Sequence, residues 1–585
     1  MKLLLVSPTE QDMYMKHSAK EARSFWFARL SLTMVAALTP PDVEISIVDE
    51  NLENINFEDN TDLVGITVMT AHAPRAYEIA AQFRARGVKV ILGGIHPSAM
   101  PEEAIQHADT VVIGEAEGVW ASLIADFKRG RMKTFYKASK PSDLVGLPNP
   151  RRDLLKKGAY NIGSTVQTTR GCPFSCEFCS VTEFFGRGYR QRPVDEVIRE
   201  IEGIDGNFIA FVDDNMIGNP KYAKELFRRL APLKFQWGSQ ASITMARDPE
   251  LMKLAKESGC VGMYVGIESL SSESLAGVGK TFNNVEKYEE AIKKFHDHGI
   301  MVIASIIFGF DSDNEGIFEK TVRFLEKNKI EVATFYILTP LPGTVWAKKM
   351  ISENRITSYD WSKYNGAHVL FKPKLMSPET LSEGYRWAYH QFYSIPSVAK
   401  RLFRIHDRIP QKLLLNWGFR RMAKKLPGGE LSPFSEILNK LQKTIPTLPR
   451  EDLIPHTIKV VKNKAHETVE KIDYFLKIKV KKSEKFQAIL IDLYGVLDKI
   501  TAKRLRKKIL LAFKKGKMDI VLNFKNVSHI TPQALRVLFH KRIRRVQRYG
   551  IKLRLRNLNS STENLLKDFG LESCYVRYIE PPRSS

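Results

Sequence analysis

The sequence predicts an α/β protein with a doubly wound parallel sheet, an open partial barrel of parallel strands, and a smaller third α/β domain. Over residues 1–395, short continuous apolar runs alternate with helical periodicity, as in parallel sheets that helices cover on both faces. The 585 residues are too many for one hydrophobic core. With 43% apolar and 26% charged residues, the composition is that of an ordinary folded protein.

The first predicted domain covers residues 1–140. Its predicted strands are Lys2–Ser7, Val43–Asp49, Leu63–Thr70, Val88–Gly93 and Thr110–Gly114. Ligands of doubly wound sheets bind beyond the carboxyl ends of the strands. The candidate residues at these ends are Thr70, Gly93, Gly94, His96, Gly114 and Glu115. The paired glycines would let the backbone approach a bulky ligand closely, or they form tight turns only, and the residues leave both interpretations open.

The second predicted domain covers residues 151–395 and follows a linker with three prolines at positions 141, 148 and 150. Its predicted strands are Ser164–Thr169, Phe208–Asp213, Phe235–Ser242, Gly262–Ser269, Met301–Phe310 and Val332–Thr339. Six strands with intervening helices are too few for a closed eight-stranded barrel. The pattern therefore predicts an open (β/α)6 barrel with its site at the carboxyl ends of the strands.

The rear third of the chain is strongly basic. Residues 471–585, the third α/β domain, carry 28 Lys and Arg against 9 Asp and Glu, and residues 396–430 carry 9 against 2. The net charge is +27 beyond residue 395 and −2 before it. The basic, apolar segment at 396–430, which a connector continues to residue 470, is either an interfacial segment on anionic lipid or a helix packed on the barrel with a solvated cationic face.

Three of the five cysteines lie within eight residues, directly after the first barrel strand. Cys172, Cys176 and Cys179 have the spacing C-x3-C-x2-C. Three thiolates on one loop can hold three irons of a four-iron cluster and leave the fourth iron open. Zinc is the alternative, although it usually takes four ligands in paired spacings, and Cys260 and Cys574 stand alone. Cys260 is expected to be a buried core thiol.

The cysteine loop, with an aromatic residue before its last cysteine and five more βα units after it, resembles the radical S-adenosylmethionine (SAM) superfamily. The resemblance implies a [4Fe-4S] cluster held by the three cysteines, SAM bound to the open iron, and an electron donor for the cluster. It places Phe178 near the adenine and Glu268 among the SAM contacts. Further SAM-binding candidates at the strand ends are Asp213, Gln240 and Gly309.

The domain ahead of the barrel, with the sequences GGIHPSAMPEEA and VVIGEAE, resembles the cobalamin-binding subfamily of these enzymes, close to the branch with the hopanoid C-methylases. The resemblance implies cobalamin as a further cofactor. The D-x-H-x-x-G motif that supplies a histidine to cobalt in cobalamin-dependent mutases is absent. His96 is therefore expected to shape its loop or support the site rather than bind cobalt.

Residues 486–582 resemble the STAS fold of anti-sigma-factor antagonists. Gln533 stands where regulatory members of that family have a phosphorylated serine, so a phosphorylation switch is not expected there. The clustered cations of this domain would attract anionic lipid or an acidic protein. Nucleic acid is not expected as a partner, because no aromatic stacking platform is interleaved with these cations.

Together these observations predict a cobalamin-dependent radical SAM methyltransferase acting on an unactivated carbon of an apolar or lipid-like substrate. A radical oxidoreductase or cyclase with the same cofactors is one alternative. A membrane or regulatory binding protein working through its STAS-like domain is another. No apolar run reaches the roughly 18 residues that span a bilayer, and the first residues resemble a strand rather than a secretory signal. We therefore expect a cytoplasmic protein, with peripheral association on the inner face of the membrane.

Overall fold

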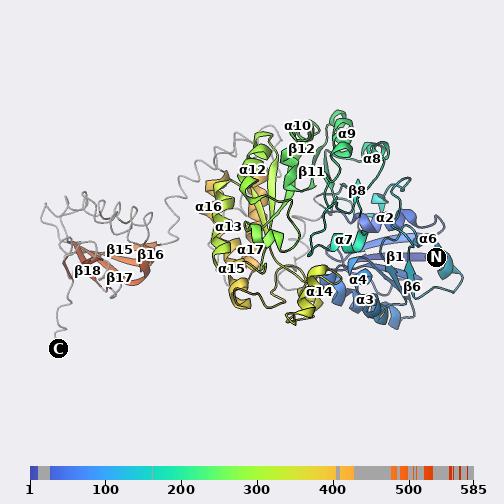
Figure 1. Ribbon diagram of the computed structural model, residues 1–585. Coiled ribbons are helices and arrows are strands. Elements are labelled where there is room, and N and C mark those ends of the chain that lie inside the picture. The colour runs from blue at the N-terminus through green and yellow to red at the C-terminus, as the bar shows by residue number, and fades with distance from the viewer. Residues whose placement is uncertain are drawn as a thin grey trace. The chain divides into compact units, whose positions relative to one another are not determined.

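The computed structural model divides the chain into two compact units, Met1–Glu430 and Leu431–Ser585 (Figure 1). It describes residues 1–10, 27–160, 162–186, 188–402 and 409–426 of the first unit. Of the second unit it describes five strands between residues 476 and 577 and a few single residues. Gln533, the connector before residue 470 and the clustered cations of the predicted STAS-like domain lie outside the described residues.

The first unit begins with a six-stranded parallel sheet in the order β2-β1-β3-β4-β5-β6. Its strands are β1 (Lys2–Ser7), β2 (Glu44–Asp49), β3 (Leu63–Thr67), β4 (Lys89–Gly93), β5 (Thr110–Ile113) and β6 (Phe135–Lys137). The five predicted strands are all present, and the short β6 was not expected. The predicted doubly wound architecture is confirmed.

Alternate residues of β1 enter two different cores. Leu3 and Leu5 lie in one apolar cluster with α2 (Leu30–Leu38) and α6 (Trp120–Lys128). Leu4 and Val6 lie in the other, with α3 (Ala73–Ala85). Because successive strand side chains point to opposite faces, an unbroken apolar run places helices on both faces of the sheet.

The second sheet is also parallel and six-stranded, in the order β14-β13-β12-β11-β10-β7. Its strands are β7 (Thr165–Val166), β10 (Phe208–Phe211), β11 (Gln236–Ala241), β12 (Cys260–Glu268), β13 (Met301–Phe308) and β14 (Val332–Ile337). The sheet has two edges, β14 and β7, so the predicted open barrel is confirmed. The strand expected at Ser164–Thr169 ends early, because a carboxylate takes up the N–H groups of Thr168 and Thr169.

Helices alternate with these strands on the outside of the barrel (Figure 1). They are α8 (Val194–Glu202), α9 (Pro220–Leu230), α10 (Pro249–Glu257), α12 (Tyr288–Asp297) and α13 (Gly316–Lys327). A further helix, α14 (Val345–Ser352), follows the last strand and contacts the cysteine loop, where the N–H of Trp346 donates to the carbonyl of Glu177. Local sequence fixes the starts of α9 and α10: the Asn219 side chain accepts from the backbone of Lys221 and Tyr222, and Asp248 accepts from Leu251. Proline follows both caps at the first helical position, where its missing N–H costs nothing.

The open edge of the barrel at β14 is covered by α15 (Pro378–Phe392) and the residue after it. The Tyr389 hydroxyl bonds to both the N–H and the C=O of Phe335, at 3.2 and 3.1 Å. The Tyr393 hydroxyl does the same for Ala333, at 3.1 and 2.6 Å. Two buried hydroxyls thus replace the missing neighbouring strand and satisfy backbone groups that an exposed edge would leave open.

The basic segment packs on the barrel through α16 (Ile395–Leu402) and α17 (Ile409–Lys425). Arg401 is fully buried and donates to the carbonyl oxygens of Ile330, Glu331 and Phe392. Lys412 is also buried and lies 3.1 Å from the Glu331 carboxylate. Of the two interpretations of this segment, the structure therefore supports the packed helix for these cations. Among the described residues, no helix is both long and apolar enough to cross a membrane.

The second unit contains a mixed sheet in the order β15-β16-β17-β18-β19. Its strands are β15 (Leu476–Ser483), β16 (Ala488–Leu497), β17 (Asp519–Ile530), β18 (Leu553–Arg556) and β19 (Val576–Arg577). The first pair is antiparallel and the others are parallel. The three strands predicted at Ala488–Leu493, Asp519–Phe524 and Lys552–Asn557 are present.

Candidate functional site

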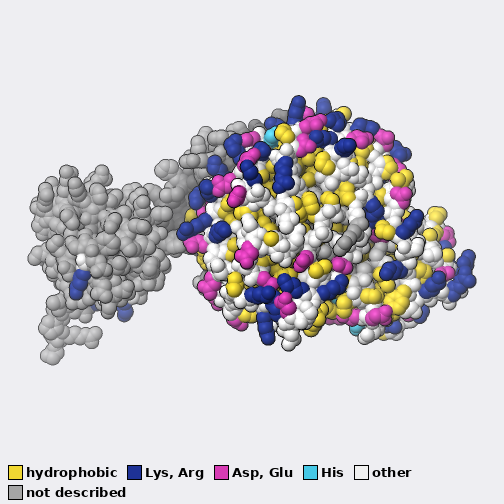
Figure 2. Space-filling view, in the orientation of Figure 1, with side chains coloured by type: hydrophobic (Ala, Val, Ile, Leu, Met, Phe, Trp, Pro, Cys, Tyr) yellow, Lys and Arg dark blue, Asp and Glu magenta, His cyan; other side chains and the backbone are white. Residues whose placement is uncertain are grey.

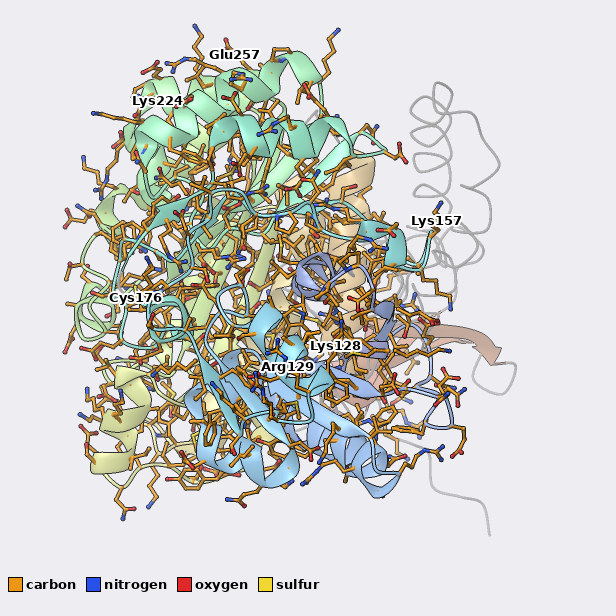
Figure 3. All side chains as sticks on the ribbon, turned by 90° about the vertical axis from the view of Figure 1, so that its right-hand side faces the viewer. Lys128, Arg129, Lys157, Cys176, Lys224 and Glu257 are labelled. Atoms are coloured by element: carbon orange, nitrogen blue, oxygen red, sulfur yellow. The ribbon has the colours of Figure 1, made fainter. Side chains whose placement is uncertain are left out.

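The three clustered cysteines lie on a loop at the carboxyl end of the barrel. The loop leaves a short strand, β8 (Thr169–Arg170), and enters α7 (Ser180–Phe185); β8 pairs with β9 (Arg190–Gln191), so the two strands close the base of the loop. Figure 3 shows Cys176 in this loop. Glu177 fastens the loop to the barrel, since its N–H donates to Val278 and its carbonyl oxygen accepts from Trp346.

The position directly before Cys172, which Gly171 occupies, accepts only glycine. Its φ is +85°, and an added Cβ would collide with the carbonyl oxygen of Gly188. The Asn215 amide lies 3.8 Å from the Cys172 sulfur, and the backbone N–H of Cys179 donates to the carbonyl of Cys176. The conformation of the loop is thus fixed by the backbone geometry at Gly171, by a contact with Asn215 and by a hydrogen bond within the loop.

The cysteine thiols fit an iron–sulfur cluster by their chemistry. All three are free and partly buried. Burial raises the pKa of Cys176 to about 11 and of Cys179 to about 12, so the thiols stay protonated until cations displace the protons. No three His, Cys, Asp or Glu side chains within the described ranges converge as ligands of a single ion. Three soft donors spread along one loop match a cluster in which each iron takes one thiolate.

Asp213, a predicted SAM contact, lies beneath the start of this loop. Its Oδ1 accepts from the backbone and hydroxyl groups of both Thr168 and Thr169. Complete burial raises the pKa of this carboxyl, and its Oδ2 is buried without a hydrogen-bond partner. Burial and the neighbouring Asp213 also raise the pKa of Asp214 to about 7; Asp214 accepts from the N–H of Gly171 at 3.3 Å. Asp213 therefore anchors the strand that leads into the cysteines.

Glu268 ends β12 in a left-handed conformation, with φ +60°. Its carboxylate accepts from the Lys280 ammonium at 2.8 Å and from the Ser305 hydroxyl at 2.9 Å. A Cβ on Gly266 would lie 2.5 Å from this carboxylate, so glycine makes room for the ion pair. The Lys280 nitrogen in turn lies 6.0 Å from the ring centre of Phe178. The structure thus brings two predicted SAM residues, Glu268 and Phe178, together around a lysine that the sequence analysis missed.

The two other predicted SAM residues belong to the strands on either side of β12. Gly309 follows β13 with φ +99°, and its N–H donates to the buried Asp313 carboxylate at 3.0 Å. A Cβ there would lie 2.8 Å from Leu381. Gln240 is exposed on β11 and pairs in register with Tyr264 of β12.

The face of the barrel sheet that carries Ser305 combines hydroxyl groups with apolar side chains. The Tyr264 hydroxyl lies 2.8 Å from that of Thr334 and 3.1 Å from that of Tyr336. Ile303 and Ile307 are partly exposed beside them, paired in register with Tyr264 and Tyr336 respectively. Sequence reasoning did not single out these residues, because a tyrosine in an apolar strand looks like core.

A cavity of about 330 Å³ opens at the carboxyl end of the first sheet. Four of the predicted cobalamin residues line it: Gly93, Gly94, Gly114 and Glu115. The wall facing the barrel is formed by Gln167, Arg170, Phe184, Phe185 and Val212. Glycines at three strand-end positions leave backbone open to a flat ligand, and the volume lies in the range of small-molecule sites. These residues are suited to face one side of a corrin ring placed next to the cysteine loop.

Thr70 and His96 do not line this cavity. Thr70 is buried in a short turn of helix. The imidazole of His96 is fully buried, with Nε2 3.1 Å from the Tyr77 hydroxyl and 3.3 Å from the Glu103 carboxylate, and its ring packs on Trp361. Burial lowers the pKa of His96, so the ring is neutral. The loop-supporting role of His96 stays a prediction.

Glu115 lines the cavity, but its carboxylate is occupied by groups of the chain itself. Oε1 accepts from Arg170 at 2.6 Å and from Arg190 at 3.1 Å, and Oε2 accepts from the N–H of Ser142 at 3.0 Å. Arg170 also donates to Glu117 at 2.5 Å. Glu115 therefore joins two domains rather than offering free oxygens to a ligand.

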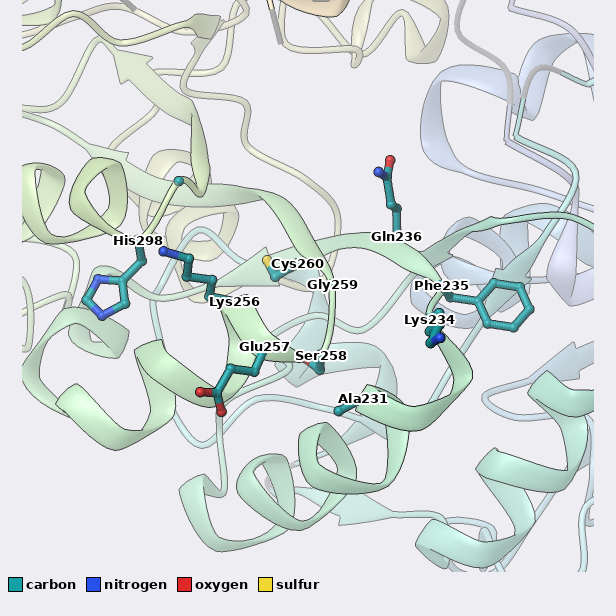
Figure 4. A pocket seen from close by; sticks show the side chains of 11 residues that line it. Ala231, Lys234, Phe235, Gln236, Lys256, Glu257, Ser258, Gly259, Cys260 and His298 are labelled. Carbon is teal, nitrogen blue, oxygen red and sulfur yellow. The ribbon is translucent and has the colours of Figure 1, made fainter. Parts of the chain in front are cut away.

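A second cavity, of about 340 Å³, opens at the opposite end of the barrel (Figure 4). It lies at the starts of β11 and β12 and is lined by Lys234, Gln236, Lys256, Cys260 and His298, among others. Cys260 is buried at the first position of β12, in agreement with its expected place in the core. Parallel sheets bind ligands beyond the carboxyl ends of their strands. This cavity lies at the amino ends, away from the cysteine loop.

Comparison with known proteins assigns a family to each region. The radical SAM superfamily model matches residues 166–325, a B12 binding domain matches residues 30–124, and a STAS domain matches residues 477–577. The matches follow the cysteine loop and its barrel, the cavity-bearing sheet, and the sheet of the second unit.

Whole-chain comparisons agree. Bacteriochlorophyllide d C-12(1)-methyltransferase of Chlorobaculum tepidum is 34% identical over 413 residues, which cover 68% of this chain and 89% of that protein. Hopanoid C-2 methylase of Rhodopseudomonas palustris is 27% identical, with coverage of 65% and 76%. The cobalamin-dependent S-adenosylmethionine radical enzyme OxsB, solved with aqua-cobalamin bound, shares the fold at TM-score 0.56 and 14% identity over 80% of each chain. The chain therefore belongs to the cobalamin-binding radical SAM family of methyltransferases, enzymes that use a [4Fe-4S] cluster, SAM and cobalamin, and it also carries a STAS domain.

Proposed function

We propose that this enzyme transfers a methyl group to an unactivated carbon of an apolar substrate. The observation that carries the proposal is the wall of the 330 Å³ cavity: residues next to the cysteine loop and strand-end glycines of the first sheet line one space. A substrate held between cobalamin in this space and the cysteine loop would meet both cofactor sites at once. Bound together, the cluster and SAM supply one-electron chemistry able to remove a hydrogen atom from carbon, and cobalamin supplies a transferable methyl group.

The chain's own residues would hold and orient these groups. We assign Cys172, Cys176 and Cys179 to three irons of the cluster. Glu268, oriented by Lys280 and Ser305, would accept hydrogen bonds from SAM, and Phe178 would lie against its adenine. Pro173 and Ser175 are exposed on the loop, which gives an electron donor an approach to the cluster.

The lining of the barrel supports an apolar substrate with a polar group at one end. Ile303 and Ile307 offer partly exposed hydrocarbon, whereas the hydroxyl groups of Tyr264, Thr334 and Tyr336 could bond to a single oxygen or nitrogen. The aromatic rings of Phe184 and Phe185, which lie edge to face, add an apolar wall on the side of the cavity. Few convergent polar groups in an apolar lining are typical of sites that fix the orientation of an apolar ligand.

The test is mass spectrometry of lipid and pigment extracts from cells with the native chain and with a Cys172→Ala variant. The proposal predicts a compound heavier by one CH2 group only with the native chain. SAM consumption without any such compound would contradict methylation and favour the oxidoreductase or cyclase alternative. A cellular function that survives loss of all three cysteines would instead place the activity in the STAS domain.

We further propose that α17 contributes to peripheral association with an anionic membrane. Leu413 and Leu414 are 41% and 58% exposed on this helix, and the Arg421 guanidinium lies 5.2 Å from the ring centre of Trp417. The net charge of residues 396–430 is positive, whereas Figure 2 shows basic and acidic side chains interspersed over the visible face of the first unit. Cations near an anionic surface contribute about 1 kcal/mol each.

Vesicle sedimentation tests this membrane proposal. The native chain should co-sediment with anionic vesicles at low salt and less at high salt, because salt screens the attraction. The double variant Leu413→Gln, Leu414→Gln should sediment less, and Ile351→Gln, which removes a 56% exposed side chain from α14, should not change it. Arg420 is unsuited as a probe, since it donates to the carbonyl of Tyr393. Equal sedimentation of the double variant and the native chain would contradict the proposal.

A further inference from the structure

Four charged side chains meet where the cavity-bearing sheet contacts the cysteine loop. The Arg170 guanidinium donates a hydrogen bond from Nη1 to the Glu115 carboxylate at 2.6 Å and one from Nη2 to the Glu117 carboxylate at 2.5 Å. Arg190 lies 2.9 Å from Glu115 and also donates to the carbonyl of Ser142. The side chains of Arg170, Glu115 and Glu117 are at most 11% exposed. We call these four residues the Arg170 bridge.

The bridge links residues that are close in sequence to each of the two cofactor regions. Arg170 is two residues before Cys172, and Glu115 and Glu117 lie one and three residues after Gly114, which follows β5. Arg170, Glu115 and Glu117 all line the 330 Å³ cavity. A movement of the cavity wall at Glu115 would therefore be transmitted to the first cysteine of the loop.

The geometry of the bridge favours a fixed separation. A guanidinium donates from a rigid planar fork, so two carboxylates held by it have one relative position. On the loop side, Gly171 follows Arg170 directly with φ +85°, a conformation in which an added Cβ would collide with the carbonyl oxygen of Gly188. Buried ion pairs often add little net stability compared with apolar replacements, and in some proteins they specify geometry instead.

We propose that Arg170 is a positioning residue that sets the distance between the cysteine-bound cluster and cobalamin. The proposal rests on the proposed function, since it needs both cofactors in their assigned sites. Arg170 does not touch the reacting atoms; it acts through Glu115 and Glu117 on one side and through the loop on the other. Substrate must fit between two cofactors, and displacements of about 1 Å can cost about a hundredfold in rate.

The test measures the cluster-to-cobalt distance in the full chain reconstituted with iron, sulfide and hydroxocobalamin. Pulsed electron paramagnetic resonance of the reduced cluster and cob(II)alamin reports this distance without any substrate. The native chain should give one narrow distribution. Arg170→Gln, measured on the fraction loaded with both cofactors, should lose the narrow maximum, and Arg170→Lys, which retains the charge without the fork, should recover it in part.

A matched control separates positioning from general stability. Arg192 makes a similarly buried pair with Glu200 of α8, at 2.5 Å, so Arg192→Gln removes a comparable ion pair that does not include Glu115 or Glu117. It should leave the distance unchanged. If Arg170→Gln does not fold, Glu117→Gln removes one charged arm of the bridge and carries the same expectation of a broader distribution.

The proposal is overturned if Arg170→Gln or Glu117→Gln, loaded with both cofactors, gives the native distance distribution. It is also overturned if Arg192→Gln broadens the distribution equally. A native chain that binds no cobalamin would refute the proposed function instead, so the two failures are distinguishable.

Discussion

Two cavities of nearly equal volume differ in how they are built: one of about 330 Å³ lies where the carboxyl end of the first sheet faces the barrel, and one of about 340 Å³ lies at the amino end of the barrel. At the carboxyl end, the lining comes from both sheets, strand-end glycines expose the backbone, and buried ion pairs fix the wall. At the amino end, the lining comes from helix ends and strand starts of the barrel alone, with exposed Lys234 and Lys256. The volume of a cavity alone does not indicate a functional site. A lining formed by strand ends from two different sheets does.

The largest expected difference between the two ends lies in their cysteines. Replacing Cys172, Cys176 or Cys179 by Ala should abolish cluster binding and SAM cleavage, because each iron held by the loop has one thiolate. Cys260→Ser, at the amino-end cavity, should leave both unchanged. Iron content and 5′-deoxyadenosine release after anaerobic reconstitution are the measurements. A Cys172→Ala protein with full iron content and SAM cleavage would refute the assignment of the loop.

The next largest effect is expected at Glu268. Glu268→Gln removes the charge that pairs with the buried Lys280, and breaking a buried pair costs about 3–5 kcal/mol. SAM should bind at least about tenfold more weakly, the equivalent of about 1.4 kcal/mol from a lost charged acceptor. Isothermal titration with SAM and chemical denaturation check the two effects. Glu257→Gln, an exposed change at the amino-end cavity, is the control and should do neither; native SAM affinity in Glu268→Gln would contradict the assigned role.

A smaller effect on stability alone is expected at the barrel edge. Tyr389→Phe deletes the hydroxyl that satisfies both backbone groups of Phe335, and leaving buried polar groups open costs about 1–3 kcal/mol. Chemical denaturation should show this loss, while iron content and cobalamin uptake stay at native levels. Tyr359→Phe, at an exposed tyrosine, should change none of these quantities. Equal stability of Tyr389→Phe and the native chain would show that the edge is satisfied in another way.

Replacing His96 is expected to have no effect on the cobalt spectrum. The imidazole faces Tyr77, Glu103 and Trp361 and lies outside the cavity lining. The electron paramagnetic resonance of cob(II)alamin should therefore be the same in His96→Gln and in the native chain. Nitrogen splitting that is present in the native chain and disappears in His96→Gln would identify His96 as a cobalt ligand.

Residues close in sequence could be assigned to the site from sequence, and residues joined only by folding could not. The apolar runs predicted the strands, because burial on both faces leaves a continuous signal, and the spacing of Cys172, Cys176 and Cys179 is visible on one loop. Lys280 could not be found, since nothing in the sequence shows that it will be buried against Glu268. The sequence also did not show that Glu115, a predicted cobalamin residue, would pair with Arg170, 55 residues further along the chain. Thr70 and His96 were chosen for their place near strand ends, but their side chains turn away from the cavity lining.

The central claim is that cobalamin occupies the cavity at the carboxyl end of the first sheet, beside the cysteine loop. Gly93 has ordinary φ and its nearest side-chain contact for an added Cβ is 3.7 Å, so Gly93→Phe should fold and fill the cavity. Gln236→Phe places the same ring at the amino-end cavity. In absorbance titrations with hydroxocobalamin, the native chain and Gln236→Phe should bind one equivalent and Gly93→Phe should bind none. Native-level binding by Gly93→Phe would contradict the claim.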